Sequence, residues 1–142
     1  MREDYLISIK GTMEQDGETD TVDLLTRGSF VRRNGKFFIS YKESEATGYE
    51  GNTTTVKVED TNKVSMLRHG DAPSQLVIEL GRRHVCHYDS VHGSLSFGVA
   101  AEEIENNLTE EGGDLMFSYT LDMGDSTFSK NQVNITVQEA YK

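Results

Sequence analysis

Cysteine and proline are almost absent from this chain of 142 residues, which contains only Cys86 and Pro73 and has no tryptophan. A single cysteine excludes a disulfide framework within the chain. With one proline and no Ser/Gly-rich or low-complexity tract, there is no candidate linker, and we expect residues 1–142 to form one domain. No segment approaches the run of ~18 apolar residues that a membrane span requires.

Positive charge is also scarce, because 14 Lys and Arg stand against 24 Asp and Glu and give a formal net charge of −10. No Lys or Arg occurs from His84 to Ser129. An acidic surface repels phosphate groups, so nucleic acid and anionic membranes are not expected partners. The stretch 84–129, which has carboxylates but no Lys or Arg, is either a solvated face that keeps the protein monomeric and soluble, or a surface for a basic protein partner or a divalent cation.

The N-terminal residues Met-Arg-Glu-Asp-Tyr are not followed by the apolar run that a signal peptide needs. We therefore expect a cytoplasmic protein. A cytoplasmic setting also agrees with the near absence of cysteine.

The chain is rich in alternating apolar and polar residues, the pattern of strands that bury one face. The clearest run places Leu115, Phe117, Tyr119 and Leu121 at every second position. Pairs such as Asn34-Gly35, which tolerate positive φ, separate the runs. About ten such runs without intervening helices predict an all-β, closed antiparallel up-and-down barrel, because closure removes both exposed sheet edges.

Residues 99–108 fit two descriptions. The apolar positions change parity between Phe97 and Val99 on one side and Ile104 and Leu108 on the other. Because one inserted residue turns a strand over, we favour a long strand with a bulge. A short helix is the alternative.

Residues that often carry chemistry form no recognisable constellation. His84, Cys86 and His87 are close in sequence, but they lack a second cysteine and paired-ligand spacing, and the other histidines are His69 and His92. The chain has no Gly-x-Ser-x-Gly elbow and no glycine-rich loop from strand to helix. We therefore predict no catalytic residue, metal site or cofactor, and rank an enzyme below a binding protein.

Several polar residues share the parity of the apolar positions expected to face the interior. If Ile39 faces inward, Tyr41 and Glu43 follow, and Met66 brings Arg68 in the same way. By this argument the candidate ligand-binding residues are Tyr41, Glu43, Arg68, Tyr88 and Tyr119. Such groups can hold the charged head of a small ligand while its chain lies on Leu, Phe and Met. The alternative is structural, with Arg68 paired to Glu43 and the phenols reaching the rim.

Four segments carry a family resemblance, namely 39–48, 51–58, 93–99 and 106–113. Together they resemble the YwiB family of small bacterial proteins, found mostly in Firmicutes, and the similarity runs over nearly the whole chain. The resemblance implies a calycin-like β-barrel, related in shape to lipocalins and fatty-acid-binding proteins, in a bacterial cytoplasm. The family is of unknown function, so the resemblance implies no catalytic or ligand-binding residue.

Two functions of different classes follow from these observations. The first is a barrel that binds a small amphipathic or anionic ligand without catalysis. The alternative is a protein-interaction or regulatory module that uses its acidic surface against a basic protein. An internal cavity of roughly a few hundred Å³ favours the first, whereas a barrel packed solid with side chains excludes it.

Overall fold

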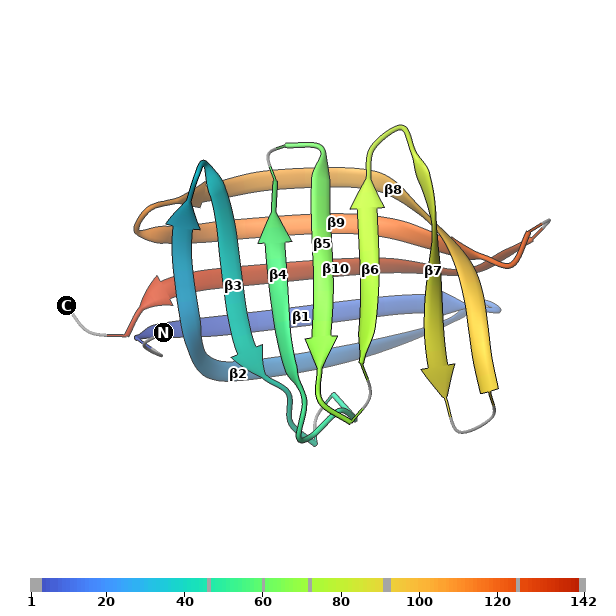
Figure 1. The fold of residues 1–142 in the computed structure, drawn as a ribbon, viewed down its shortest axis with the longest axis horizontal. Helices are drawn as coiled ribbons and strands as arrows, with labels where there is room; N and C mark the ends of the chain where they lie inside the picture. Colours follow the sequence, from blue (N-terminus) through green and yellow to red (C-terminus); the bar gives the residue numbers. More distant parts are fainter. Residues whose placement is uncertain are drawn as a thin grey trace.

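The computed structural model describes residues 4–45, 47–59, 61–71, 73–90, 93–124 and 126–140, without the side chains of 88–90 and 93–94. These residues form ten antiparallel strands, in which β1 pairs with β10 and every other neighbour is consecutive (Figure 1). The predicted all-β up-and-down barrel of about ten strands is therefore confirmed. The strands are β1 (Tyr5–Gln15), β2 (Glu18–Arg33), β3 (Lys36–Lys42), β4 (Thr53–Val58), β5 (Lys63–His69), β6 (Ser74–Glu79), β7 (Arg83–Ser90), β8 (Gly93–Thr109), β9 (Gly112–Asp122) and β10 (Thr127–Glu139).

Alternation and turn chemistry explain why these segments form hairpins. In β3 the residues Phe37, Ile39 and Tyr41 are buried, while their neighbours are not. At the β2–β3 turn, Asn34 and Gly35 both have positive φ, 54° and 77°, as a tight two-residue hairpin requires. No described segment forms a helix long and apolar enough to cross a membrane.

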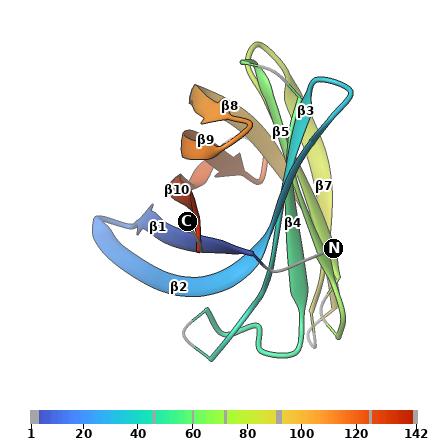
Figure 2. The same ribbon diagram turned by 90° about the vertical axis from the view of Figure 1, so that its left-hand side faces the viewer.

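The strands form two facing layers joined by two long, curved strands. Figure 2 shows β3–β7 on one side and β1, β9 and β10 on the other, with β2 and β8 passing between them. The β8 register shifts between Ala101 and Glu103, so β8 is one strand with a bulge. The predicted bulge is confirmed, and the short helix is wrong. The physical reason is that β8 must turn from one layer to the other, which a bulge allows.

One end of the barrel is filled more completely than the other. The β2–β3, β4–β5, β6–β7 and β8–β9 connections lie at one end, which we call the packed end. We call the opposite end the open end. Burying one such aliphatic or aromatic side chain stabilises a fold by about 1.5–3 kcal/mol, so the packed end contributes strongly to stability. The buried side chains there include Ile7, Phe37, Val58, Val64, Ile78, Leu115, Ile135 and Val137.

The barrel closes weakly between β6 and β7. Among the residues that the structure describes, their ladder contains one pair, Ser74 with Tyr88, and an isolated bridge joins Glu79 to Arg82 at the packed end. The neighbouring β5–β6 ladder continues from Lys63 to Arg68 without interruption. In Figure 1, β6 and β7 stand further apart than the strands to their left. We call this junction the β6–β7 seam.

Gly28 is the residue at which β2 pairs with both layers, with Tyr5 in β1 and Tyr41 in β3. A Cβ at this position would overlap the carbonyl oxygen of Ser40 and Cδ1 of Ile7. We expect Gly28→Ala to lower the free energy of unfolding by about 1–3 kcal/mol, because a well-packed site does not accept an extra carbon. Urea unfolding followed by circular dichroism measures the change.

Gly11→Ala is the matched control, since a Cβ there meets nothing within 4 Å. We expect this variant to stay within about 1 kcal/mol of the unmodified protein. Equal stability of the two variants would contradict the assigned role of Gly28.

Candidate functional site

A polar row of inward-facing residues runs across the β3–β7 layer toward the open end. Antiparallel pairing places ladder partners side by side, so one row can be followed from strand to strand. The row consists of Tyr41, Thr54, Arg68 and Ser74, with Tyr88 next in the ladder. The neighbouring row toward the packed end is Ile39, Val56, Met66 and Leu76. The interior therefore changes from apolar to polar between one row and the next.

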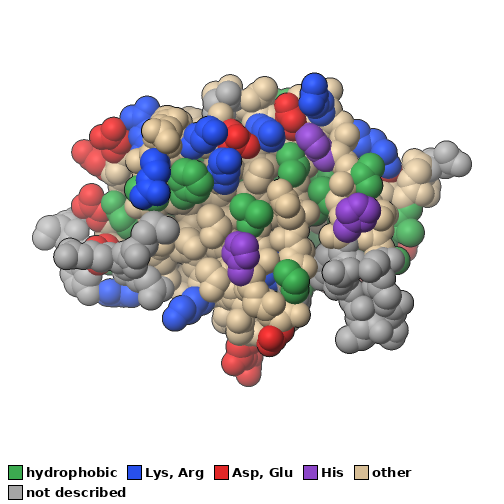
Figure 3. Space-filling model, in the orientation of Figure 1, with side chains coloured by type: hydrophobic (Ala, Val, Ile, Leu, Met, Phe, Trp, Pro, Cys, Tyr) green, Lys and Arg blue, Asp and Glu red, His purple; other side chains and the backbone are tan. Residues whose placement is uncertain are grey.

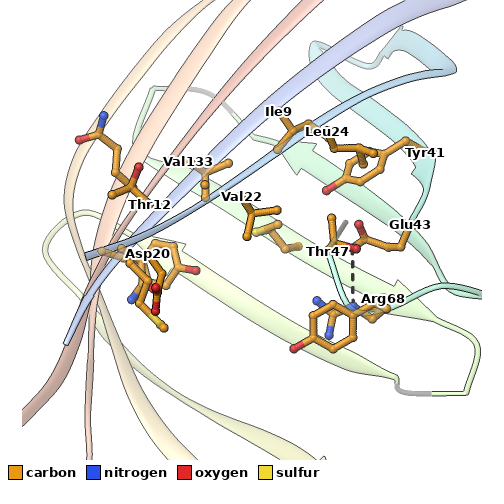
Figure 4. A pocket seen from close by; sticks show the side chains of 17 residues that line it. Ile9, Thr12, Asp20, Val22, Leu24, Tyr41, Glu43, Thr47, Arg68 and Val133 are labelled. Atoms are coloured by element: carbon orange, nitrogen blue, oxygen red, sulfur yellow. Dashed lines mark ion pairs between the residues drawn. The ribbon is translucent and has the colours of Figure 1, made fainter. Parts of the chain in front are cut away.

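Arg68 is the centre of this polar row. Its Nε lies 3.8 Å from Oε2 of Glu43, and its Nη1 donates a hydrogen bond to Oγ of Ser74 at 3.2 Å. The guanidinium carbon stands 3.5 Å from the ring centroid of Tyr49, which stacks on it. Figure 4 shows Glu43 and Arg68 facing each other across the site, joined by the dashed line. Ion pairing and stacking thus hold the guanidinium in the barrel interior.

The ion pair leaves polar atoms without partners. Thr54 Oγ1 donates a hydrogen bond to Glu43 Oε2 at 2.8 Å. Among the described residues, however, Glu43 Oε1 and Arg68 Nε have no hydrogen-bond partner. The side chains are 5% and 15% exposed, so these atoms are also shielded from solvent. The structural alternative therefore describes the pair that is observed, but a buried pair with unpaired atoms is costly to maintain.

Two tyrosine phenols face the same interior. Burial raises the pKa of Tyr41 well above its ordinary value, and the carboxylate of Glu43 raises it further, while Arg68 acts in the opposite direction. Burial raises the pKa of Tyr119 to about 12, again against an opposing effect of Arg68. At neutral pH both phenols are therefore protonated, and each can donate a hydrogen bond.

A cavity of about 300 Å³ opens beside Arg68 toward β1 and β2. Figure 4 shows the aliphatic side chains on its β1, β2 and β10 walls facing the polar residues of β3 and β5. Its apolar lining includes Ile9, Val22, Leu24, Met66 and Val133.

A second cavity of about 440 Å³ lies on the other side of Arg68, toward β7–β9. Met13, Tyr49, Arg68 and Tyr119 line both cavities, so the two spaces meet at the guanidinium. Apolar side chains predominate in the second lobe, among them Leu76, Cys86, Leu95, Phe97, Leu121 and Phe128. The barrel interior is a two-lobed space with a cation at its centre.

Four of the residues proposed from parity, Tyr41, Glu43, Arg68 and Tyr119, line the first cavity together. Tyr88 lies in the ladder beside Ser74, and its side chain is outside the described residues.

Parity did not identify Tyr49, Thr54 or Ser74. Thr54 and Ser74 share the parity of neighbouring core residues and could have been found in this way. Tyr49 lies in the β3–β4 connection, where no periodic signal applies.

The histidine and cysteine cluster near β7 does not converge on one point. His84 forms a contact of 2.9 Å with Glu79, whereas His87 forms a hydrogen bond with Ser96 of β8. Cys86 is buried. Among the residues that the structure describes, no three His, Cys, Asp or Glu side chains are placed to hold a metal ion. His92 lies outside the described residues.

Comparison with known proteins supports the fold and the predicted resemblance. Residues 7–135 match a family described as a domain of unknown function, DUF1934. The chain is 24% identical over 132 residues to the uncharacterised β-barrel protein YwiB of Bacillus subtilis, covering 93% of this chain and 91% of that protein. The crystal structure of the ywiB protein from Bacillus subtilis superposes with a TM-score of 0.82 at 22% identity, over 95% of this chain and 90% of that one. The resemblance to the YwiB family is confirmed.

The buried phenol of Tyr119 makes the stability sensitive to alkaline pH. An unfolded tyrosine loses its proton near pH ~10, whereas the folded protein keeps it until a pKa of about 12. The free energy of unfolding therefore falls as pH rises from about 10 to about 12, and the full contribution is present below pH ~10. In Tyr119→Phe we expect a shallower alkaline slope, measured by urea unfolding across this range. An unchanged slope would contradict the assignment.

Proposed function

This chain belongs to the DUF1934 family, and we propose that its barrel binds a small amphipathic anion without catalysing a reaction on it. The observation that carries the proposal is the two-lobed interior that meets at Arg68. Neither lobe is filled by side chains, and both lie in the range of about 300–1,000 Å³ that ligand pockets occupy.

The head of such a ligand would bind at the polar row. A guanidinium offers five N–H donors and no acceptor, and in Arg68 one nitrogen is used by Ser74 while Nε has no hydrogen-bond partner among the described residues. The protonated phenols of Tyr41 and Tyr119 line the first cavity with it. A carboxylate placed there can accept from Arg68 and from a phenol, and charge-assisted bonds of this kind are the stronger class of hydrogen bond.

The rest of the ligand would lie on aliphatic and aromatic walls. Ile9, Leu24 and Val133 supply them in one lobe, and Phe97 and Leu121 in the other. Removing apolar surface from water contributes about 25 cal/mol per Å², so an alkyl chain gains affinity by entering either lobe. An amphipathic molecule matches both the polar row and these walls.

Glu43 competes with the ligand for the guanidinium. The separation of 3.8 Å between Arg68 Nε and Glu43 Oε2 exceeds the about 2.7–2.9 Å of a charge-assisted hydrogen bond, so the existing pair is not a close one. An incoming carboxylate can approach Arg68 more closely than Glu43 does. The repulsion between two carboxylates nevertheless weakens binding, and neutralising Glu43 should strengthen it.

Calorimetric titration with decanoate tests the proposal. We expect Arg68→Met to weaken decanoate binding at least tenfold, about 1.4 kcal/mol, because the head group loses its cation. We expect Glu43→Gln to strengthen it several-fold, because the competing charge is removed. Arg33→Met is the matched control, because it removes the same charge from an exposed arginine that lies at the packed end, outside both cavities.

A purely structural pair gives different results. In that case Glu43→Gln leaves decanoate affinity unchanged, and the unmodified protein shows no preference for decanoate over the neutral analogue decanol. Arg68→Met leaves a buried carboxylate without its cation, so circular dichroism checks that each variant is folded. The double variant Glu43→Gln/Arg68→Met removes both charges and restores a neutral site. Decanoate binding to the double variant as tight as to the unmodified protein would also refute the proposal.

A further inference from the structure

The β6–β7 seam bears a cavity of its own. This space of about 370 Å³ is lined by Gln75 and Val77 of β6 and by His84, Val85, Cys86 and His87 of β7. Gln75, Cys86 and His87 also line the inner cavity of about 440 Å³. The cavity at the seam therefore adjoins the lobe that leads to Arg68.

Few contacts between described residues hold this part of the wall closed. Ser74 and Tyr88 form the ladder pair at one end of the seam, and the Glu79–Arg82 bridge lies at the other. At that second end a contact of 2.9 Å between His84 Nε2 and Glu79 Oε1 also joins the two strands. Separating two strands costs the hydrogen bonds of their ladder, so β6 and β7 can part at lower cost than strands joined by a full ladder.

The open end is electrostatically unfavourable for an anion. Its β1–β2 turn and its β3–β4, β5–β6 and β9–β10 connections contain several carboxylates and no Lys or Arg. Like charges at an entrance lower the local concentration of an anionic molecule and slow its association. The exposed carboxylates in these connections include Asp16, Glu45, Glu50 and Asp71.

The seam presents the opposite environment. Among the described residues no carboxylate lines its cavity, two of the lining side chains are histidines, His84 and His87, and the carboxylate of Glu79 contacts His84 at the packed-end edge. Val85 is 57% exposed and offers apolar surface at the same place. In Figure 3, purple histidines and green apolar side chains lie on the right-hand part of this face, and red carboxylates lie along its upper edge and on its lower projection. An amphipathic anion meets less repulsion here than at the open end.

We propose that the anionic ligand enters sideways through the β6–β7 seam, between Gln75 and His87, and reaches Arg68 through the lobe of about 440 Å³. This inference rests on the proposed binding function and adds the route by which the site is reached. Parting of β6 and β7 becomes the step that limits association and release.

Cross-linking the seam separates this route from the open end. In a Cys86→Ala background, Gln75→Cys and His87→Cys provide two thiols on opposite strands, which a short bismaleimide joins. The control joins Ser40→Cys to Thr55→Cys, because these residues pair across the β3–β4 ladder with their hydroxyl oxygens 3.0 Å apart. Association of the fluorescent fatty acid dansylaminoundecanoate is followed by stopped flow before and after linking.

We expect the seam link to slow association and release at least tenfold with little change in affinity, and the control link to change neither rate. An association rate unaffected by the seam link overturns the route while leaving the binding function intact, and equal slowing by both links also overturns it. If the unlinked protein does not bind dansylaminoundecanoate or decanoate at all, the binding function fails and the route fails with it.

A single substitution provides a second test that needs no linker. Gln75→Glu places a carboxylate at the seam, and we expect it to slow association several-fold at low salt, with the difference disappearing as salt screens the charge. Thr55→Glu, on the outer face of β4, is the charge-matched control and should leave the rate unchanged. Equal rates for the two variants would contradict access through the seam.

Discussion

The buried contact between Arg68 and Glu43 is the constraint on which the interior of this barrel depends. Two opposite charges face each other at 3.8 Å, shielded from solvent, with Tyr49 stacked on the guanidinium. Charges in such a position require partners, and this pair satisfies only part of its hydrogen-bonding capacity among the described residues. A barrel selected for stability alone would gain by replacing the pair with well-packed apolar side chains.

Close packing and open space are divided between the two ends of the barrel. Side chains such as Ile7, Val64 and Ile78 are fully buried toward the packed end, and they stabilise the closed sheet. The open half contains the space, the cation and the phenols. This division allows the interior around Arg68 to remain hollow, because the packed end supplies the apolar burial that folding requires.

The alternation of apolar and polar residues was sufficient to predict the strands, because successive side chains in a strand point to opposite faces. The same spacing predicted the inward direction of Tyr41, Glu43, Arg68 and Tyr119. The bulge in β8 was predictable for the same reason, since an extra residue reverses parity. Tyr49 was not predictable, because it lies in a connection whose path depends on tertiary contacts. The weak seam was also missed, since the sequences of β6 and β7 alternate normally and the defect arises only from how the two strands meet.

Native mass spectrometry of the full chain as purified tests most directly whether the interior is a binding site. The expected result is a species heavier than the 15.9 kDa chain by the mass of one small molecule, present in the unmodified protein and absent from Arg68→Met. A spectrum of the bare chain alone, with no mass added when decanoate is supplied, would contradict a ligand-binding barrel and leave Arg68 and Glu43 as a structural pair.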